Sequence, residues 1–263
     1  MQPSIWKKYN QKRPFEARVD SVFKWFNMPE AIRPRLILLY FHEPDKTGHQ
    51  YGPKSIKTRK MVEKMDELLG SIIKKMKPLN IYDQLNFIIL SDHGMVETSK
   101  KKIISLNKYI NTKEIKIEGS GPYALLYGDN KYELDKAYKD LKKVNNINIY
   151  KKEQIPNDWH FNNHYRIKDL LIVAKEGWTI LEKEQNITTY FSKGNHGYDN
   201  KLKSMNAIFF ATGPYFKKNY IAPIINNIDI YPLIAYILNI KPYDKIDGDI
   251  KNIKNILKND IND

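Results

Sequence analysis

Three short segments of the sequence gather side chains that can bind metal ions. They are Asp45 and His49 in YFHEPDKTGHQYGP, Asp92 and His93 in SDHGM, and His196 in KGNHGYDN. Carboxylate and imidazole groups without a sulfur ligand suit divalent ions, most simply zinc. Two such ions about 4 Å apart can hold the oxygens of a phosphoryl group during an in-line displacement. The set therefore predicts a centre for two divalent metal ions of the kind that suits displacement at phosphorus.

Each segment alone also has a purely structural explanation. Loops are polar in general, and SDHG can be a turn in which the aspartate accepts backbone hydrogen bonds. Taken together, the three segments favour metal binding, because three of the six histidines lie in glycine-flanked loops and two of them have an aspartate nearby. We expect His42 to be a polar neighbour of the site. His160 and His164 are expected to be hydrogen-bonded loop or substrate-rim residues rather than ligands.

The apolar patterns predict an α/β fold with a mainly parallel sheet flanked by helices. Continuous apolar runs predict strands at Leu36–Phe41, Asn86–Leu90, Pro122–Gly128, Ile147–Lys151, Asp169–Lys175 and Asn206–Pro214. Helical spacing predicts helices over residues 55–77, 132–144 and 226–240. In the first of these, Ser55 is the expected N-terminal cap and Pro78 is expected to end the helix. Functional loops in such sheets lie beyond the carboxyl ends of the strands, so the three metal-binding segments are expected to meet at one rim.

The composition limits the classes of protein to consider. The chain has 263 residues, 41% of them hydrophobic, and no cysteine, so it is globular and has neither disulfides nor thiolate ligands. It contains no apolar run of membrane-spanning length and no targeting signal. The net charge of +14 comes from lysines spread along the whole chain among many Asn and Ile residues. Compositional drift explains this better than a nucleic-acid surface, so no specific nucleic-acid partner is expected.

At these residues the chain resembles the ectonucleotide pyrophosphatase/phosphodiesterase family of the alkaline phosphatase superfamily. The matching motifs are PFEARVDSVFKWF, LYFHEPDKTGHQYGP, SDHGM, IPNDWHFNNHYRIKDLLIVAKEGW and KGNHGYDNKLKSMNAIFFATGPYF. The resemblance implies an alkaline-phosphatase-like fold, in which residues 1–263 are the C-terminal part of one catalytic domain. It also implies a two-zinc phosphodiesterase that cleaves nucleotide pyrophosphate or phosphodiester bonds or, in some members, choline phospholipids.

The resemblance also implies roles for single residues. Asp45, His49 and His196 would hold one zinc ion, and Asp92 and His93 would be ligands of the other. Tyr40 matches an aromatic position that stacks on a nucleobase, which is physically reasonable because an aromatic face accepts any base. The alternative for Tyr40 is that it ends a strand and packs.

One part of the family pattern has no match. In the family a nucleophilic Thr, a further zinc-binding Asp and an oxyanion-stabilising Asn precede PFEARVD. Here the thirteen residues MQPSIWKKYNQKR precede that motif and contain neither Thr nor Asp. The N-terminal part of the domain is therefore expected to be missing, and no catalytic nucleophile is assigned. The alternative function is a catalytically inactive metal-binding pseudoenzyme or scaffold fragment.

The location of the intact protein is also inferred from the resemblance. The family is mostly extracytoplasmic, so we expect an extracellular or cell-surface protein, with any membrane attachment made by a segment outside this chain. The triplet Asn186–Thr188 (NIT) is a possible glycosylation site in an expected exposed loop. Such triplets also arise by chance in chains rich in asparagine.

Overall fold

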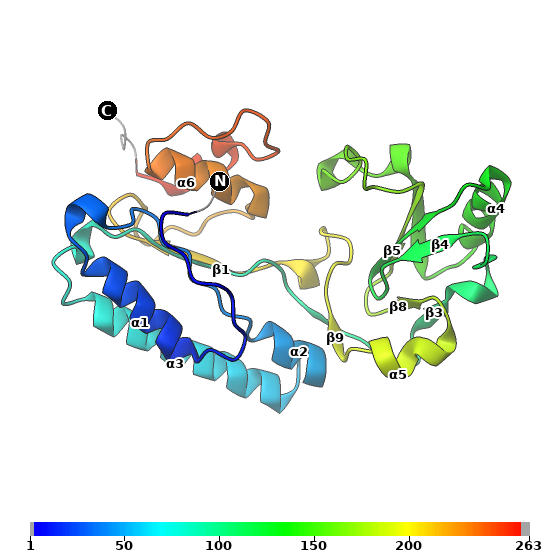
Figure 1. Cartoon of the computed structure of the whole chain (residues 1–263), viewed down its shortest axis with the longest axis horizontal. Coiled ribbons are helices and arrows are strands. Elements are labelled where there is room, and N and C mark those ends of the chain that lie inside the picture. Colours follow the sequence, from blue (N-terminus) through cyan, green and yellow to red (C-terminus); the bar gives the residue numbers. More distant parts are fainter. Residues whose placement is uncertain (1–2, 259–263) are drawn as a thin grey trace. The chain divides into compact units, whose positions relative to one another are not determined.

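The computed structural model describes residues 3–258, and the chain divides into two compact units (Figure 1). Unit 1 comprises Met1–Glu43, Val62–Leu90 and Phe209–Asp263, and unit 2 comprises Pro44–Met61 and Ser91–Ile208. Both contain helices and strands, which confirms the α/β class.

Unit 2 is built on a four-stranded sheet in which every neighbouring pair is antiparallel. Its order is β4 (Lys116–Glu118), β5 (Tyr123–Tyr127), β7 (Leu170–Ala174) and β6 (Ile147–Lys151). Helix α4 (Lys131–Leu141) connects β5 to β6, and these two strands are parallel to each other because both are antiparallel to β7. The predicted mainly parallel sheet is wrong, since the later strand β7 lies between the two strands that the helix joins.

The core of unit 2 lies between this sheet and α4. All five residues of β7 are buried, as a short and continuously apolar run predicts. The inward face of α4 buries Leu134, Ala137 and Leu141, and the Asn130 side chain caps the helix by accepting the Glu133 N–H at 3.3 Å. A second, two-stranded sheet pairs β3 (Ile103–Ser105) with β8 (Thr179–Leu181) in parallel.

Unit 1 packs helices on two sides of a two-stranded antiparallel sheet. Its elements are α1 (Phe15–Phe26), most of α3 (Ile56–Met76), β1 (Phe87–Leu90), β10 (Phe209–Thr212) and α6 (Ile230–Ile237). Phe87 packs with residues of α1 and α3, whereas Ile88 packs with residues of α6. The hydroxyl of Ser55 accepts the Thr58 N–H at 3.1 Å, and α3 ends two residues before Pro78, so both predicted ends of this helix are confirmed.

The predicted buried strand at Leu36–Phe41 is wrong. Within residues 3–258 this segment forms no β-ladder, although Leu39 and Phe41 pack against the cluster of Val19, Ile72 and Met76. Leu38, which alternates with them, is 79% exposed. An apolar run identifies a segment suited to a sheet, but a strand also requires a hydrogen-bonding neighbour.

The predicted glycosylation triplet does not lie in an open loop. Asn186 is half-buried and ends a 3₁₀ turn (Glu184–Asn186) directly before α5 (Ile187–Tyr190). The expectation of an exposed loop is therefore wrong, because the backbone at Asn186 continues into a helical turn. Glycosylation of Asn186 stays a prediction.

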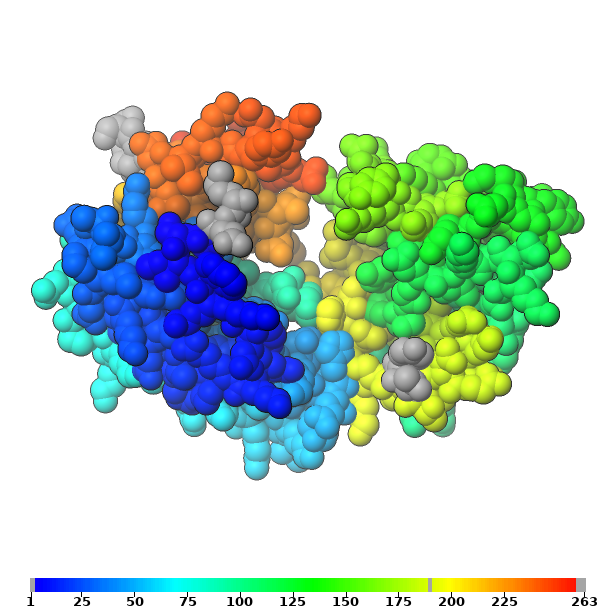
Figure 2. All heavy atoms as spheres, in the orientation of Figure 1, coloured from blue at the N-terminus to red at the C-terminus, as the bar shows by residue number. Residues whose placement is uncertain are grey.

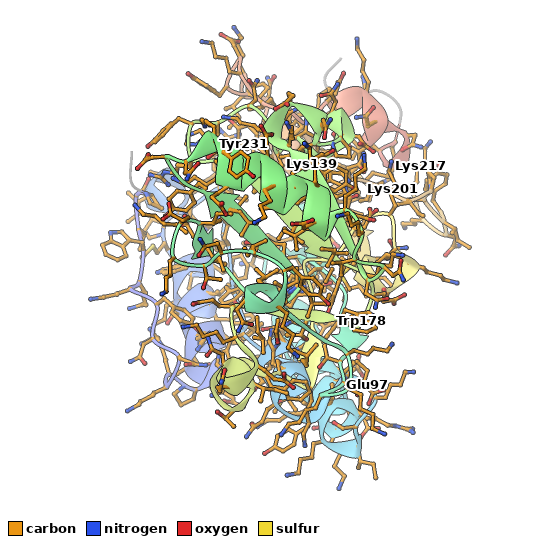
Figure 3. All side chains as sticks on the ribbon, turned by 90° about the vertical axis from the view of Figure 1, so that its right-hand side faces the viewer. Glu97, Lys139, Trp178, Lys201, Lys217 and Tyr231 are labelled. Carbon is orange, nitrogen blue, oxygen red and sulfur yellow. The ribbon has the colours of Figure 1, made fainter. Side chains whose placement is uncertain are left out.

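The surface is rich in basic and aromatic side chains. Residues 3–13 run along the outside of unit 1, where Trp6 and Tyr9 are exposed (Figure 2). Lysines project from unit 2, as Lys139 and Lys201 show (Figure 3), and Lys201 Nζ lies 2.7 Å from an Asp158 carboxylate oxygen. No helix within residues 3–258 combines the length and the apolar character needed to cross a membrane.

Candidate metal centre

A short helix places the first two metal-binding side chains on one side. Helix α2 (Asp45–Tyr51) begins after Pro44 and ends at Gly52, whose φ of +91° is a conformation that glycine adopts without strain. Residues four apart in a helix are neighbours on its surface. The Nε2 atom of His49 accordingly lies 3.3 Å from an Asp45 carboxylate oxygen.

A two-residue ladder aligns the other two segments. Strand β2 (Val96–Glu97) pairs antiparallel with β9 (Gly194–Asn195), with Val96 opposite Asn195. His93 lies just before β2 and His196 directly after β9, so this pairing brings their side chains together. Strands of two residues carry too little pattern to be predicted from the sequence.

Helix α2 packs closely on β9. A Cβ atom on Gly194 would lie 2.6 Å from the Gly48 carbonyl oxygen and 2.7 Å from the Met95 sulfur. The Lys193 N–H donates to the His49 carbonyl at 2.9 Å. The three segments therefore meet as predicted, but through helix–strand packing rather than at the rim of a parallel sheet.

Asp45, His49 and His196 form the one group of three potential metal ligands found within the part of the chain that the structure describes. Their ligand atoms all lie within 4.8 Å of one another. The His196 Nε2 atom is 3.5 Å from the Asp45 oxygen Oδ1 and 3.2 Å from His49 Nε2. Asp45 Oδ1 is buried and has no hydrogen-bond partner within residues 3–258. A buried carboxylate oxygen facing two imidazole nitrogens fits a bound cation, which would satisfy all three atoms.

Burial affects the protonation of His196. It lowers the pKa of His196 below the ordinary value, because the imidazolium ion loses hydration. The adjacent His93 lowers this pKa further, and the Asp45 carboxylate opposes both effects. The environment therefore favours the neutral imidazole, which is the form that binds metals.

Asp92 and His93 lie beside this group. The His93 ring stacks on the His196 ring with 3.4 Å between centroids and 12° between planes. The His93 Nδ1–H donates to the Gly94 carbonyl at 2.9 Å, since a carbonyl oxygen can only accept, and in the neutral ring the lone pair is then on Nε2. That Nε2 atom is 3.4 Å from an Asp92 carboxylate oxygen.

The other singled-out residues have local contacts of their own. Tyr40 belongs to unit 1, is 60% exposed, and has its ring 5.8 Å from that of Tyr9. His42, also in unit 1, packs edge-on against Phe15. His164 accepts the Arg166 N–H at 3.2 Å, which confirms its prediction as a hydrogen-bonded loop residue. His160 likewise lies outside the group of potential ligands.

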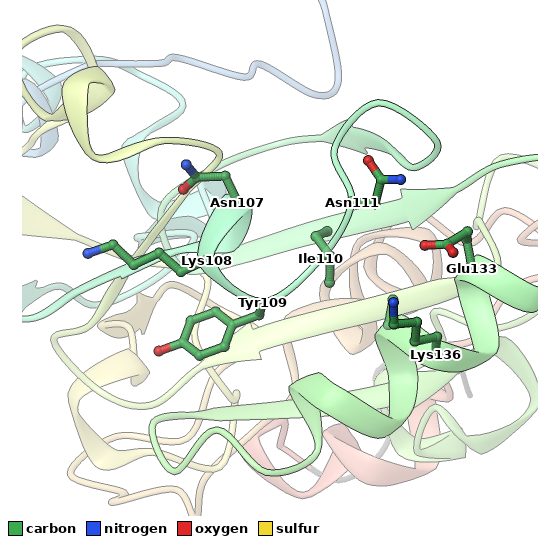
Figure 4. Close-up of a pocket in the computed structure, with 8 residues that line it drawn as sticks. Asn107, Lys108, Tyr109, Ile110, Asn111, Glu133 and Lys136 are labelled. Carbon is green, nitrogen blue, oxygen red and sulfur yellow. The ribbon is translucent and has the colours of Figure 1, made fainter.

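A separate open pocket of about 190 Å³ lies between α4 and the 3₁₀ turn Leu106–Lys108 (Figure 4). Its polar lining consists of Asn107, Lys108, Tyr109, Asn111, Glu133 and Lys136. Lys108 is already paired with Glu184 at 2.7 Å. None of the predicted site residues lines this pocket.

Comparison with known proteins gives the family. Residues 1–199 match the family model described as type I phosphodiesterase / nucleotide pyrophosphatase, and the chain belongs to this family. It is 37% identical to human ectonucleotide pyrophosphatase/phosphodiesterase family member 5 over 257 residues, covering 97% of this chain and 52% of the relative. It is also 37% identical to the bis(5'-adenosyl)-triphosphatase enpp4 of Mus musculus, covering 91% of this chain and 52% of that protein.

Solved structures agree with this assignment. The structure of human ectonucleotide pyrophosphatase/phosphodiesterase 5 superposes with a TM-score of 0.88 at 36% identity, covering 97% of this chain and 67% of that one. An inactive form of the murine protein, in complex with AMP, has a TM-score of 0.89 at 34% identity. The predicted family and α/β fold class are confirmed, and the chain spans about half the length of the curated relatives named above.

Proposed function

We propose that the protein is a zinc-dependent phosphodiesterase that hydrolyses nucleotide phosphodiester or pyrophosphate bonds. The observation that carries the proposal is the buried Asp45 Oδ1 atom, which faces the Nε2 atoms of His49 and His196 without a hydrogen-bond partner among the described residues. The family assignment supports the reaction class.

Asp45, His49 and His196 would hold one zinc ion, and Asp92 and His93 would contribute to a second. A zinc ion bound there would act as a Lewis acid towards a phosphoryl oxygen. The Asp45 carboxylate would offset part of the charge of the ion. The two histidines would bind as neutral rings, which the lowered pKa of His196 favours.

Nucleotides are the favoured substrate class. One similar protein is named a bis(5'-adenosyl)-triphosphatase, and the structure of another contains AMP. The name of a further relative, the venom phosphodiesterase of Naja atra (34% identical), supports an extracellular location for the intact protein. Residues 1–263 would then form part of a phosphodiesterase catalytic domain.

Metal analysis tests the proposal directly. The purified chain should contain zinc, and His49→Ala combined with His196→Ala should reduce the bound zinc by about tenfold or more, because two of three ligands are lost. Circular dichroism would check that the double variant is folded. Equal zinc content in the two proteins would overturn the assignment.

A second candidate is a metal-binding protein without catalysis, because no catalytic nucleophile is assigned to a residue of this chain. Hydrolysis of a nitrophenyl ester of thymidine monophosphate distinguishes the two. Zinc-dependent turnover that disappears in the double variant supports the phosphodiesterase and contradicts the second candidate. Bound zinc without turnover supports the second candidate.

A further inference from the structure

The ring of His49 is held in place through its Nδ1 atom, whereas Nε2 is the proposed ligand atom. Its Nδ1 atom lies 2.7 Å from the Gly194 carbonyl oxygen and 2.9 Å from the Ser192 hydroxyl oxygen. A carbonyl oxygen has only lone pairs, so a hydrogen bond at 2.7 Å requires the proton on Nδ1. In the neutral ring this leaves the lone pair on Nε2, which faces Asp45 and His196.

Ser192 is itself held in place by the surrounding backbone. Its Oγ lies 2.6 Å from the Gly194 carbonyl and 2.9 Å from the His49 carbonyl, and its single proton can be donated to either. Its lone pairs then point towards the proton on the His49 ring. The Thr98 hydroxyl donates to the Ser192 carbonyl, and the Thr98 N–H donates to the Lys193 carbonyl at 3.0 Å. Backbone groups on both sides therefore fix the position of the serine hydroxyl.

We propose that Ser192 is a positioning residue that, as the second partner of the Nδ1–H beside the Gly194 carbonyl, fixes the angle of the His49 ring. This inference rests on the proposed function, because it assumes that Nε2 of His49 binds the cation. An imidazole whose ring is free to rotate would turn the Nε2 lone pair away from the metal part of the time. Removing an outer partner of a metal-binding histidine lowers metal affinity by about 10- to 100-fold.

The sequence did not indicate this role. Serine is common in loops, and its distance of 143 residues from His49 along the chain gives no hint of contact. The close packing of α2 on β9 brings the two together.

Two measurements test the proposal in three variants. Nitrogen-15 spectra of the metal-free protein report the hydrogen bonding of each ring nitrogen of His49, and competition with a chelating dye gives the affinity for Zn²⁺. Ser192→Ala removes the hydroxyl, and Ser192→Thr retains it. Ser55→Ala is the matched control. Among the described residues the Ser55 side chain bonds only to Thr58, in its own turn, so this variant also loses a serine hydroxyl but none that contacts His49.

We expect Ser192→Ala to shift the Nδ1 resonance of His49, because the Nδ1–H loses one of its two acceptors, and to lower the affinity for Zn²⁺ about tenfold. Ser192→Thr should restore both values, and Ser55→Ala should change neither. Unchanged spectra and affinity in Ser192→Ala would overturn the positioning role, as would an equal loss of affinity in Ser55→Ala. Failure of the proposed function is a separate result, namely that the wild-type chain binds no more Zn²⁺ than the His49→Ala, His196→Ala double variant.

Discussion

Unit 2 buries its central strands, whereas unit 1 leaves much of its apolar surface exposed. Every residue of β7 is buried, but β10 alternates and leaves Phe210 63% exposed. In unit 1 the segment Leu36–Phe41 exposes Leu38, and the loop before α6 exposes Ile221 and Ile224. Unit 1 therefore exposes large aliphatic or phenyl side chains from three separate segments.

The comparison indicates which part of the molecule supports the metal centre. All five predicted metal-binding residues belong to unit 2. The predicted strand before Asp45 does not form, yet α2 is positioned, because the Gly48 and Gly194 backbones pack together and the Lys193 N–H binds the His49 carbonyl. Support for the centre therefore comes from the better-packed unit.

The largest expected effect is on the stability of the buried sheet. Leu126 in β5 is completely buried, so Leu126→Ala should lower the free energy of unfolding by about 2–5 kcal/mol through lost burial and a cavity. The matched change in unit 1, Leu38→Ala, should alter it by less than about 0.5 kcal/mol. Guanidinium unfolding followed by circular dichroism measures both. Similar shifts in the two variants would contradict the contrast between the units.

A smaller effect is expected at the contact between α2 and β9. Gly194→Ala places a methyl group against the Gly48 carbonyl, which should cost about 1–3 kcal/mol of stability and weaken zinc binding by moving His49 from His196. Gly70→Ala, in the part of α3 that belongs to unit 1, has no atom within 4 Å of the new carbon. It should stabilise the helix by about 0.5–1 kcal/mol and leave zinc binding unchanged. Normal zinc affinity in Gly194→Ala would show that this contact does not position His49 for zinc binding.

The smallest expected effect concerns Tyr40, the one predicted site residue in unit 1. If it stacks on a base, Tyr40→Ala should weaken AMP binding to the zinc-loaded protein by about 1 kcal/mol, or about fivefold. Tyr132→Ala on α4, where the ring is also exposed, is the control and should have no effect. Calorimetric titration with AMP measures both. Identical affinities in the Tyr40 variant and the wild type would confine the predicted substrate contacts to unit 2.

The sequence predicted individual elements better than their arrangement. Strand β6 has the predicted bounds, and β1, β5, β7 and α3 lie within or close to theirs, because each has a strong local pattern with turn residues at its ends. The order of the strands depends on which segments pair, and the helix between β5 and β6 wrongly suggested parallel neighbours. The prediction of a strand at Leu36–Phe41 failed for the same reason, because the local sequence does not determine whether a segment finds a pairing strand.

The same distinction applies to the metal centre. Asp45 and His49 were found from their spacing, and His196 from its flanking glycines. Ser192 and the Gly194 carbonyl could not be found in this way, because a hydroxyl and a backbone oxygen acquire their role only through contact with a distant ring. Residue type thus revealed the groups that face the proposed ion but not the groups behind them.

The position of β7 in the sheet has a consequence for the order of folding. Strands β5 and β6 are complete once residue 151 has been synthesised, but both pair with β7, which ends at Ala174. The growing chain cannot close the sheet before then, and closing it brings together segments far apart in sequence, which is entropically slow. His196 is synthesised later still, so the group of Asp45, His49 and His196 can form only after all four strands of this sheet have been made.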